Sequence, residues 1–250
     1  MASAMPNTAK IRLYVAQALH TGTSVPVTRD QANYLYAVMR LRAGERILVF
    51  DGLSGEYAAT VQDISKRGGL LRIEAQTRPL QPPPDLWLLF APIKKARTDF
   101  IVEKAAEMGV TRICPVLTEY TNSERIRRDR LQAHAIEAAE QCGNTFVPEV
   151  VELAPLSRIL SDWPSDRRLI FADEARVGEV NRMPTPEASV TRDPWAVLIG
   201  PEGGFSPAER ERLTAMDQVQ VISLGPRILR ADTAAVAALT LFQASLGDWR

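Results

Sequence analysis

Short apolar segments separated by turn residues make up most of the first 75 or so residues of the chain. The strand-like segments are IRLYVA, VPVT, RILVFDG, GEYAATVQDI and LLRIEAQT. Turn pairs such as Asp51-Gly52 and Gly68-Gly69 interrupt them. The segment RDQANYLYAVMRL has the helical period instead, with Ala32, Leu35, Val38 and Met39 on one face. Several short strands and one helix predict a small β-barrel.

A proline-rich segment, TRPLQPPPDLW, ends this pattern. Consecutive prolines fit neither a strand ladder nor a helix interior, and they favour an extended spacer. The expected organisation is therefore a domain over residues 1–78, a linker over 79–85 and a second domain over 86–250.

Beyond the linker, apolar strands alternate with helical segments. The predicted strands are LWLLFAPI, VTRICPVLT, RLIFADE, WAVLIGPEGG and VQVISLGP, and the predicted helices are RTDFIVEKAAEMG, RLQAHAIEAAEQCG, SPAERERLTAM and DTAAVAALTLFQASLGDW. Strands that are apolar throughout predict an α/β fold whose parallel sheet is covered on both faces. The polar stretch NRMPTPEASVTRDP is a loop long enough to belong to a site.

Composition narrows the possible functions only slightly. The chain has 250 residues with a formal net charge of zero, which neither favours nor excludes a nucleic-acid partner. Cys114 and Cys142 are the only cysteines and form no C-x-x-C pair, so we expect a reduced, cytoplasmic setting and no metal site. Neither a secretory signal nor a membrane-spanning apolar run is visible. His20 and His134 are remote from the glycine motifs described next, which argues against histidine-based catalysis.

Two predicted strands end in a Gly-Pro turn, the first within LIGPEGGF (198–205) and the second within LGPRILRADTAA (224–235). In open parallel sheets, ligands bind outside the carboxyl ends of the strands. In the first turn, glycines permit close approach of the backbone, and Ser206 and Glu209 form a capping box that starts a helix. No P-loop or dinucleotide fingerprint is present, and Glu202 would repel a phosphate. The turn therefore suits a ligand with little negative charge or a cationic one; the alternative is a tight strand–helix turn without a ligand.

The second turn has a different character. Ile228 and Leu229, which could line a flat pocket, lie between Arg227 and Arg230, which could hold RNA phosphates or carbonyl oxygens. Asp232 or Thr233 is predicted to cap the long final helix. The alternative for each arginine is a surface salt bridge.

Together the motifs LIGPEGGFSPAE and LGPRILRADTAAVAAL resemble those of the knotted SPOUT methyltransferases, and more narrowly the RsmE family, which methylates N3 of a uridine in 16S ribosomal RNA. RTDFIVEKAAEMGV and EAAEQCG recur in that family in the same order, and YAVMRLRAGERILVFDG is similar to its PUA-like RNA-binding barrel. The resemblance implies a trefoil-knotted C-terminal domain, S-adenosylmethionine as cofactor, the small ribosomal subunit as partner and a homodimer.

The resemblance also implies which residues form the site. It assigns the cofactor to Leu198, Ile199, Gly200, Gly203, Gly204, Leu224, Gly225, Ile228, Leu229, Thr233 and Ala234. Arg230 is our candidate for stabilising negative charge on a uracil carbonyl oxygen, and Glu202 is a weaker candidate base for the N3 proton. For Glu202 the alternative is hydrogen bonding within its own turn.

Basic residues of both domains are candidates for contacts with RNA phosphates: Arg40, Arg42, Arg46, Lys94, Arg97, Arg125, Arg127, Arg128 and Arg130. The alternatives are a solvated rim for the first three and a helix start on a solvated face for the last four. Two departures from the family concern RNA contact: Asn144 replaces a usual arginine, and Lys95 and Ala96 differ from the usual KGDR-like loop, which Lys94 and Arg97 match.

Three other functions remain open at this point. A knotted enzyme acting on a ribose 2′-hydroxyl shares the same motifs. A non-catalytic RNA-binding or ribosome assembly factor could keep the fold, although the motif glycines are intact. A dinucleotide-dependent enzyme is disfavoured by the missing fingerprint.

Overall fold

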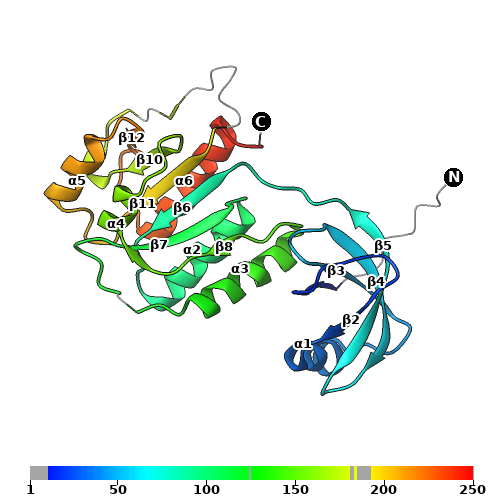
Figure 1. Ribbon diagram of the computed structural model, residues 1–250. Coiled ribbons are helices and arrows are strands. Elements are labelled where there is room, and N and C mark those ends of the chain that lie inside the picture. Colours follow the sequence, from blue (N-terminus) through cyan, green and yellow to red (C-terminus); the bar gives the residue numbers. More distant parts are fainter. Residues whose placement is uncertain (1–10, 124, 181–182, 185–192, 250) are drawn as a thin grey trace. The chain divides into compact units, whose positions relative to one another are not determined.

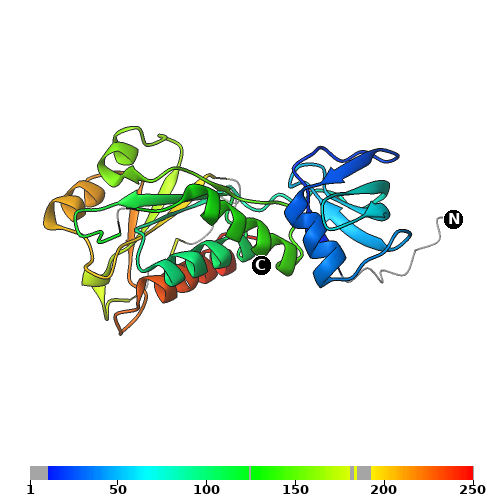
Figure 2. The ribbon, with the colours of Figure 1, turned by 90° about the horizontal axis from the view of Figure 1, so that it is seen from below.

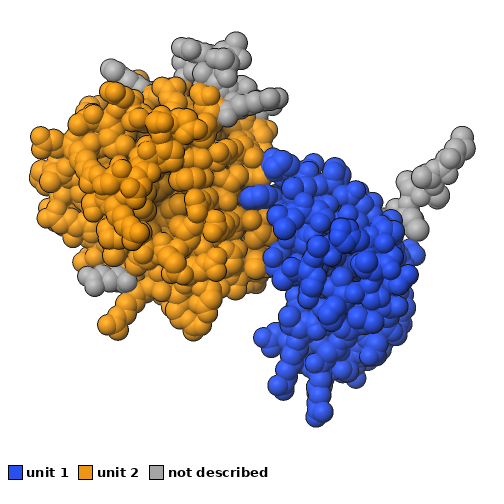
Figure 3. Space-filling model, in the orientation of Figure 1, with its two compact units in different colours: residues 1–82, 139–146 blue, residues 83–138, 147–250 orange. Residues whose placement is uncertain are grey.

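The computed structural model describes residues 11–123, 125–180, 183–184 and 193–249. The chain divides into two compact units, coloured separately in Figure 3. Unit 1 comprises residues 1–82 with 139–146, and unit 2 comprises 83–138 with 147–250. The boundary at Pro82 and Pro83 falls within the proline-rich segment, whereas nothing in the sequence pattern indicated that 139–146 joins unit 1.

Unit 1 is built on one five-stranded sheet with the order β1-β3-β4-β5-β2 (Figure 1). The strands are β1 (Arg12–Tyr14), β2 (Ser24–Val27), β3 (Arg46–Phe50), β4 (Glu56–Ile64) and β5 (Gly69–Arg78). β1 pairs with β3 in parallel, and the other pairs are antiparallel. All five strands were predicted, and alternate residues such as Ile47, Val49 and Ala59 face a single apolar core.

The predicted helix of unit 1 is shorter and less regular than its sequence period suggests. α1 (Arg29–Asn33) starts at a capping box formed by Thr28 and Gln31, and then widens into one π-helical turn, η1 (Tyr34–Val38). A π-turn shifts the following side chains out of the 3.6-residue phase. Ala32 and Leu35 are buried as expected, but Val38 is 62% exposed and Met39 is exposed as well. The predicted single apolar face of Ala32, Leu35, Val38 and Met39 is therefore buried only at its first two residues.

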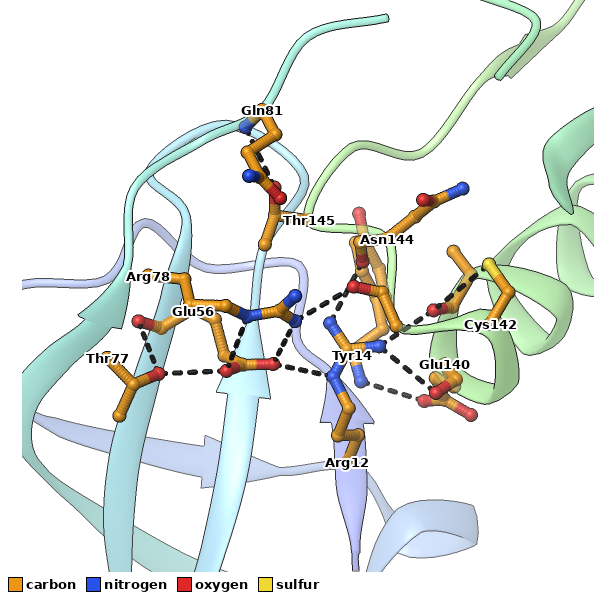
Figure 4. Close-up of polar contacts among 12 residues, drawn as sticks. Arg12, Tyr14, Glu56, Thr77, Arg78, Gln81, Glu140, Cys142, Asn144 and Thr145 are labelled. Carbon is orange, nitrogen blue, oxygen red and sulfur yellow. Dashed lines mark hydrogen bonds and ion pairs between the residues drawn. The ribbon is translucent and has the colours of Figure 1, made fainter. Parts of the chain in front are cut away.

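A buried carboxylate organises the polar interior of unit 1 (Figure 4). Glu56 is 2% exposed and accepts hydrogen bonds from Arg12 Nε at 2.6 Å, from Arg78 Nη2 at 2.7 Å and from the Thr77 hydroxyl at 2.9 Å. Burial acts to raise the pKa of Glu56, but the hydrogen bonds from Arg78, Arg12 and Thr77 outweigh it and lower that pKa below its usual value.

The same two arginines also bind the segment 139–146 (Figure 4). Arg12 donates to the carbonyl oxygens of Ala139, Glu140 and Asn144, and Arg78 donates to that of Gly143. The carbonyls at a helix C-terminus lack intrahelical partners and carry partial negative charge, so guanidinium groups stabilise them. Charged side chains of the sheet thus hold the end of α3 (Arg128–Cys142) within unit 1.

Unit 2 is an α/β fold around a seven-stranded sheet in which every pairing is parallel, as predicted. Its strands are β6 (Leu86–Phe90), β7 (Arg112–Leu117), β8 (Glu149–Val150), β9 (Ala154–Pro155), β10 (Arg168–Ala172), β11 (Trp195–Ile199) and β12 (Val219–Ile222). The main order is β12-β10-β11-β6-β7-β8, and β9 pairs with β7. The two short strands β8 and β9 were not predicted.

Helices cover both faces of this sheet, as predicted. On one face, Leu88, Phe90 and Val197 belong to a core that also contains residues of α2 (Lys95–Glu107), α3 and α6 (Ala231–Ser245). Figure 2 shows α2 and α6 side by side. On the other face, Leu89 and Leu198 pack with α4 (Leu156–Ser161) and α5 (Pro207–Thr214). Alternation along each strand therefore divides one apolar run between two cores.

Two predictions about helix ends had opposite outcomes. Ser206 and Glu209 form the predicted capping box of α5, with Pro207 at the first helical position. The prediction that Asp232 or Thr233 caps α6 is wrong: the N-cap is Arg230, which makes no side-chain capping bond.

α4 and the 3-10 turn η2 (Glu174–Arg176) were not predicted. Most of the polar loop 181–194 lies outside the described residues.

Candidate functional site

The strands that carry the two glycine turns are the two neighbours of β10 in the sheet (Figure 1). β11 and β12 both pair with β10 in parallel, so all three strands end at the same edge. The segment that follows β10 therefore lies between the two turns. It is joined to the second turn by a bond from the Gly178 amide to the Gly225 carbonyl at 3.0 Å.

A pocket opens where these three segments meet. It encloses about 590 Å³, counting the part open to solvent. Its walls come from the end of β10 and the segment after it (Ala172–Glu174 and Val177), from the end of β11 and the first turn (Ile199–Glu202), from Ser223–Gly225 and Arg227–Leu229 after β12, and from Ala231 and Ala234 of α6. Both glycine turns thus contribute to one pocket.

Most of the sequence-predicted site residues lie in this lining. Glu202, Ile199, Gly200, Leu224, Gly225, Ile228, Leu229 and Ala234 are among them. Over the part of the chain that the structure describes, the lining does not include Leu198, Gly203, Gly204, Thr233 or Arg230. Leu198 is fully buried in the sheet, and Arg230 is exposed at the start of α6.

Two acidic residues of the lining, Asp173 and Glu174, were missed by the sequence reasoning. They directly follow β10, and both are paired with Arg210 of α5. Asp173 is 6% exposed and accepts from Arg210 Nε at 3.1 Å. Partial burial acts to lower the pKa of Arg210, but the two carboxylates outweigh it and raise that pKa above its usual value. A signal was present in FADE, where acidic residues follow an apolar strand at the ligand edge of the sheet.

Two glycines of the first turn are required by close packing, one of them against this cluster. At Gly204, φ is +71° and a Cβ would lie 1.9 Å from Glu174 Oε1, whose carboxylate also accepts from the Phe205 amide at 3.3 Å. At Gly200, a Cβ would lie 2.5 Å from the Phe205 ring. Gly204 therefore acts on the pocket through the carboxylate that it admits, and Gly200 contributes to the lining itself.

Arg97, near the start of α2, joins the first turn to α6. Its Nη1 lies 2.8 Å from Glu202 Oε1, and its Nε lies 3.6 Å from Asp232 Oδ2. Arg97 was predicted to contact RNA, and in this structure its guanidinium is shared between two carboxylates. The alternative considered for Glu202 was a hydrogen bond within its own turn. In the described residues its Oε1 instead bonds to Arg97.

The other basic candidates of unit 2 differ in their surroundings. Lys94 and Arg125 are exposed. Arg127 pairs with Asp129 on the surface, and Arg128 donates to the Val150 carbonyl at 2.8 Å. Arg130 is held at 2.5 Å from Asp99, a structural ion pair.

In unit 1 the three candidate arginines are all exposed and flank the π-turn and the start of β3. Arg40 has φ of +60°, and the Arg42 guanidinium lies 5.3 Å from the centre of the Tyr36 ring. Arg46 pairs with Glu74 at 3.3 Å.

Several other chemistries find no support in the described residues. Within them, no cluster of three or more His, Cys, Asp or Glu could hold a metal ion. No helix of the described chain has the length and apolarity needed to cross a bilayer. Burial raises the pKa of the Cys114 thiol to about 12, which makes it inert. His134 lies beside Asp99 and Glu103, between α2 and α3.

Comparison with known proteins identifies the family of this chain. Residues 81–243 match the family model of the RNA methyltransferase domain. The chain belongs to this family of RNA methyltransferases. Residues 27–74 match the RNA methyltransferase PUA domain, which places a second element of the same family in unit 1.

Individual RNA methyltransferases of this family match along nearly the whole chain. Ribosomal RNA small subunit methyltransferase E of Rickettsia conorii is 29% identical over 231 residues, covering 91% of this chain and 93% of the relative. The protein of the same name from Bacillus subtilis is 27% identical over 234 residues, covering 90% and 91%. The E methyltransferase of Neisseria gonorrhoeae, solved with bound S-adenosylmethionine, is 28% identical with a TM-score of 0.83, covering 96% of this chain and 99% of that one.

The family departure at Asn144 falls in the cluster of Figure 4. The contact described there uses the Asn144 carbonyl oxygen, which accepts from Arg12 Nη2 at 2.9 Å. Because this contact is made by the backbone, it does not depend on which side chain stands at 144. Lys95 and Ala96, the other departures, are exposed in the first turn of α2.

Proposed function

We propose that this chain transfers a methyl group from S-adenosylmethionine to N3 of a uridine in the 16S RNA of the small ribosomal subunit. The observation that carries the proposal is the single pocket formed by both glycine turns in a chain of the RNA methyltransferase family. The E methyltransferases that it resembles act, by name, on small-subunit ribosomal RNA.

The pocket residues fit this cofactor. Leu224, Ile228 and Leu229 offer apolar walls for the adenine ring, and Gly200 and Gly225 expose backbone groups for its polar edge and the ribose. Asp173, Glu174 and Glu202 give the lining an acidic character suited to a sulfonium cation and unsuited to a phosphate. When bound, the cofactor supplies an electrophilic methyl group.

The protein's part in the reaction is alignment, exclusion of water and management of the N3 proton. N3 of uracil loses a proton as it is methylated, so negative charge spreads onto the neighbouring carbonyl oxygens. Arg230, exposed beside the pocket at the start of α6, is our candidate for stabilising that charge. Glu202 lines the pocket and is the candidate acceptor of the proton, with its Oε1 held by Arg97.

The proposal also includes contacts between basic side chains and RNA phosphates. The candidates are Arg40, Arg42 and Arg46 in unit 1 and Lys94, Arg97, Arg125, Arg127 and Arg128 in unit 2. We also propose the four properties that the family resemblance implies: a trefoil knot, a closed barrel, a homodimer and a cytoplasmic location.

Methyl transfer to small subunits that lack the modification tests the proposal directly. The chain is incubated with S-adenosylmethionine carrying a labelled methyl group, and the RNA is analysed by nucleoside mass spectrometry. N3-methyluridine is the expected product. Label on a ribose would replace the function by 2′-O-methylation. Cofactor binding without transfer would indicate a different RNA substrate, and absence of both binding and transfer would support the non-catalytic alternative.

The role of Arg230 has its own test. Arg230→Ala should lower the rate of methyl transfer by about 100-fold, the usual size of a lost charge-stabilising donor, with little change in cofactor affinity. Arg212→Ala, which removes a guanidinium from the outer part of α5, is the matched control. Full turnover by Arg230→Ala would remove Arg230 from the mechanism.

A further inference from the structure

Two clusters beside the pocket share one design, in which a single arginine serves two carboxylates. Arg210 lies between Asp173 and Glu174, and Arg97 lies between Glu202 and Asp232. Each cluster therefore carries one negative charge in excess when all of its groups are ionised.

Acidic residues of both clusters line the pocket. Asp173, Glu174 and Glu202 line it, whereas Asp232 does not belong to its lining in the described chain. Arg227 adds one positive charge to the lining, so the two clusters and Arg227 together comprise four carboxylates and three guanidinium groups. The side chain of Glu202 is 50% exposed. Its carboxylate can therefore attract a cationic ligand at the pocket entrance without first losing its own water.

The geometry also holds the carboxylates in place. The Gly204 turn admits the Glu174 carboxylate, and the Phe205 amide and Arg210 bind it. Asp173 and Glu174 are adjacent after β10 and both bind Arg210, so neither carboxylate can move without losing an ion pair. A field from fixed charges acts on a ligand without reorganisation at the time of binding.

We infer that this pocket distinguishes ligands by charge, and that Glu202 and Glu174 favour the sulfonium form of the cofactor over the uncharged thioether that remains after methyl transfer. The inference rests on the proposed function and adds that the pocket prefers the cofactor to the product of the reaction. During transfer the S–CH₃ bond breaks, its electron pair stays on sulfur, and the methyl group bonds to N3 as the N3 proton leaves to a base. The sulfur thereby loses its positive charge, the attraction to the carboxylates disappears, and release of S-adenosylhomocysteine becomes easier.

Calorimetric titration of the full chain with S-adenosylmethionine and with S-adenosylhomocysteine measures this preference as a ratio of dissociation constants. Glu202→Gln should lower the preference for the charged ligand by about three- to tenfold, the effect of one charge across a partly solvated gap. Asp232→Asn is the matched control, because it removes a carboxylate from the same arginine without changing the lining, and it should change the ratio by less than about twofold. Glu174→Gln, which keeps the size of the side chain, tests the second cluster and should act as Glu202→Gln does.

The outcomes separate the inference from the proposed function. An unchanged ratio in Glu202→Gln and Glu174→Gln, each with an unchanged melting temperature, would overturn the inference while leaving cofactor binding intact. An equal decrease in Asp232→Asn would overturn it too, because the effect would then come from Arg97 rather than from charge in the lining. Failure of the unmodified chain to bind S-adenosylmethionine would instead reject the proposed function, and the inference with it.

Discussion

Gly204 shows how a motif residue can serve a site without contacting the ligand. Its positive φ and missing Cβ make room for the carboxylate of Glu174, and Glu174, unlike Gly204, lines the pocket. The sequence pattern predicted that the glycines would approach a ligand closely. For Gly204 the close approach is to a side chain from the turn that follows a different strand, β10, which no spacing within the motif indicates.

A substitution at this residue should therefore affect both folding and binding. Gly204→Ala is expected to lower the free energy of unfolding by about 1–3 kcal/mol, because a non-glycine residue is strained at this φ and its Cβ displaces Glu174. Affinity for S-adenosylmethionine should fall at the same time. Chemical denaturation and calorimetry on the same preparations measure the two effects.

Gly203→Ala is the control for that experiment. Its Cβ would lie 3.2 Å from Tyr120 Cβ, and no positive φ is involved, so the neighbour has to move only slightly. Equal loss of affinity in the two variants would contradict the link between Gly204 and Glu174.

Glu56 provides a second prediction at the residue scale, in unit 1. Glu56→Gln leaves Arg12 and Arg78 without their buried counter-charge, and breaking such a pair is expected to destabilise the fold by about 3 kcal/mol at neutral pH. Glu74→Gln, at the solvated pair with Arg46, should cost less than about 1 kcal/mol. Urea denaturation followed by circular dichroism compares the variants, and equal losses would show that Glu56 is not the organising charge.

The same residue gives unit 1 a defined pH dependence. The pKa of Glu56 is lowered by folding, so its contribution to stability is fully present above the unfolded-state value of 4.5 and is lost as pH falls through the lower folded-state pKa. The difference in unfolding free energy between the unmodified chain and Glu56→Gln should thus shrink between about pH 5 and pH 3. A difference that stays constant over this range would contradict the assignment.

At the scale of elements, the position of β10 explains why two distant turns form one pocket. The strand–helix alternation predicted a parallel sheet, and parallel strands end at a common edge, but the order of the strands is not contained in the alternation. Because β10 lies between β11 and β12, its following acidic segment fills the space between the turns. The motif FADE indicated acidic residues at the ligand edge, but not that Asp173 and Glu174 lie between the two turns, because strand order depends on contacts between residues far apart in the chain.

The helices show the same division between local and long-range causes. The Ser206 capping box was predicted because all of its determinants lie within four residues. The start of α6 was predicted wrongly: the helix begins at Ala231, so Asp232 lies within its first turn, where it pairs with Arg97. In α1, a π-turn that the apolar period does not indicate turns Val38 and Met39 out to solvent.

The cap of α5 can be tested on its own. Ser206 is 2% exposed and accepts from the Glu209 amide at 3.2 Å, so Ser206→Ala should cost about 1 kcal/mol of stability. Glu211→Ala, at an exposed position of the same helix, should stay within about 0.5 kcal/mol of the unmodified chain. Thermal denaturation distinguishes the two, and an unchanged Ser206→Ala would show that the Glu209 side of the box is sufficient.

At the scale of the whole molecule, the neutral formal charge conceals local basic regions on each unit. Arg40 and Arg42 lie exposed around the π-turn of unit 1, and Lys94 and Arg125 lie exposed in unit 2.

If RNA phosphates contact both units, affinity for the small subunit should fall steeply with salt, by about 0.7 to 0.9 in logarithmic slope for each contact. Arg42→Ala and Arg125→Ala should each reduce that slope by nearly one contact, and the double variant should reduce it by the sum. Filter binding over a range of salt concentrations provides the slopes, and Arg130→Ala, which removes an arginine held by Asp99, is the control expected to leave the slope unchanged. A slope that responds to only one of the two variants would confine RNA recognition to that unit.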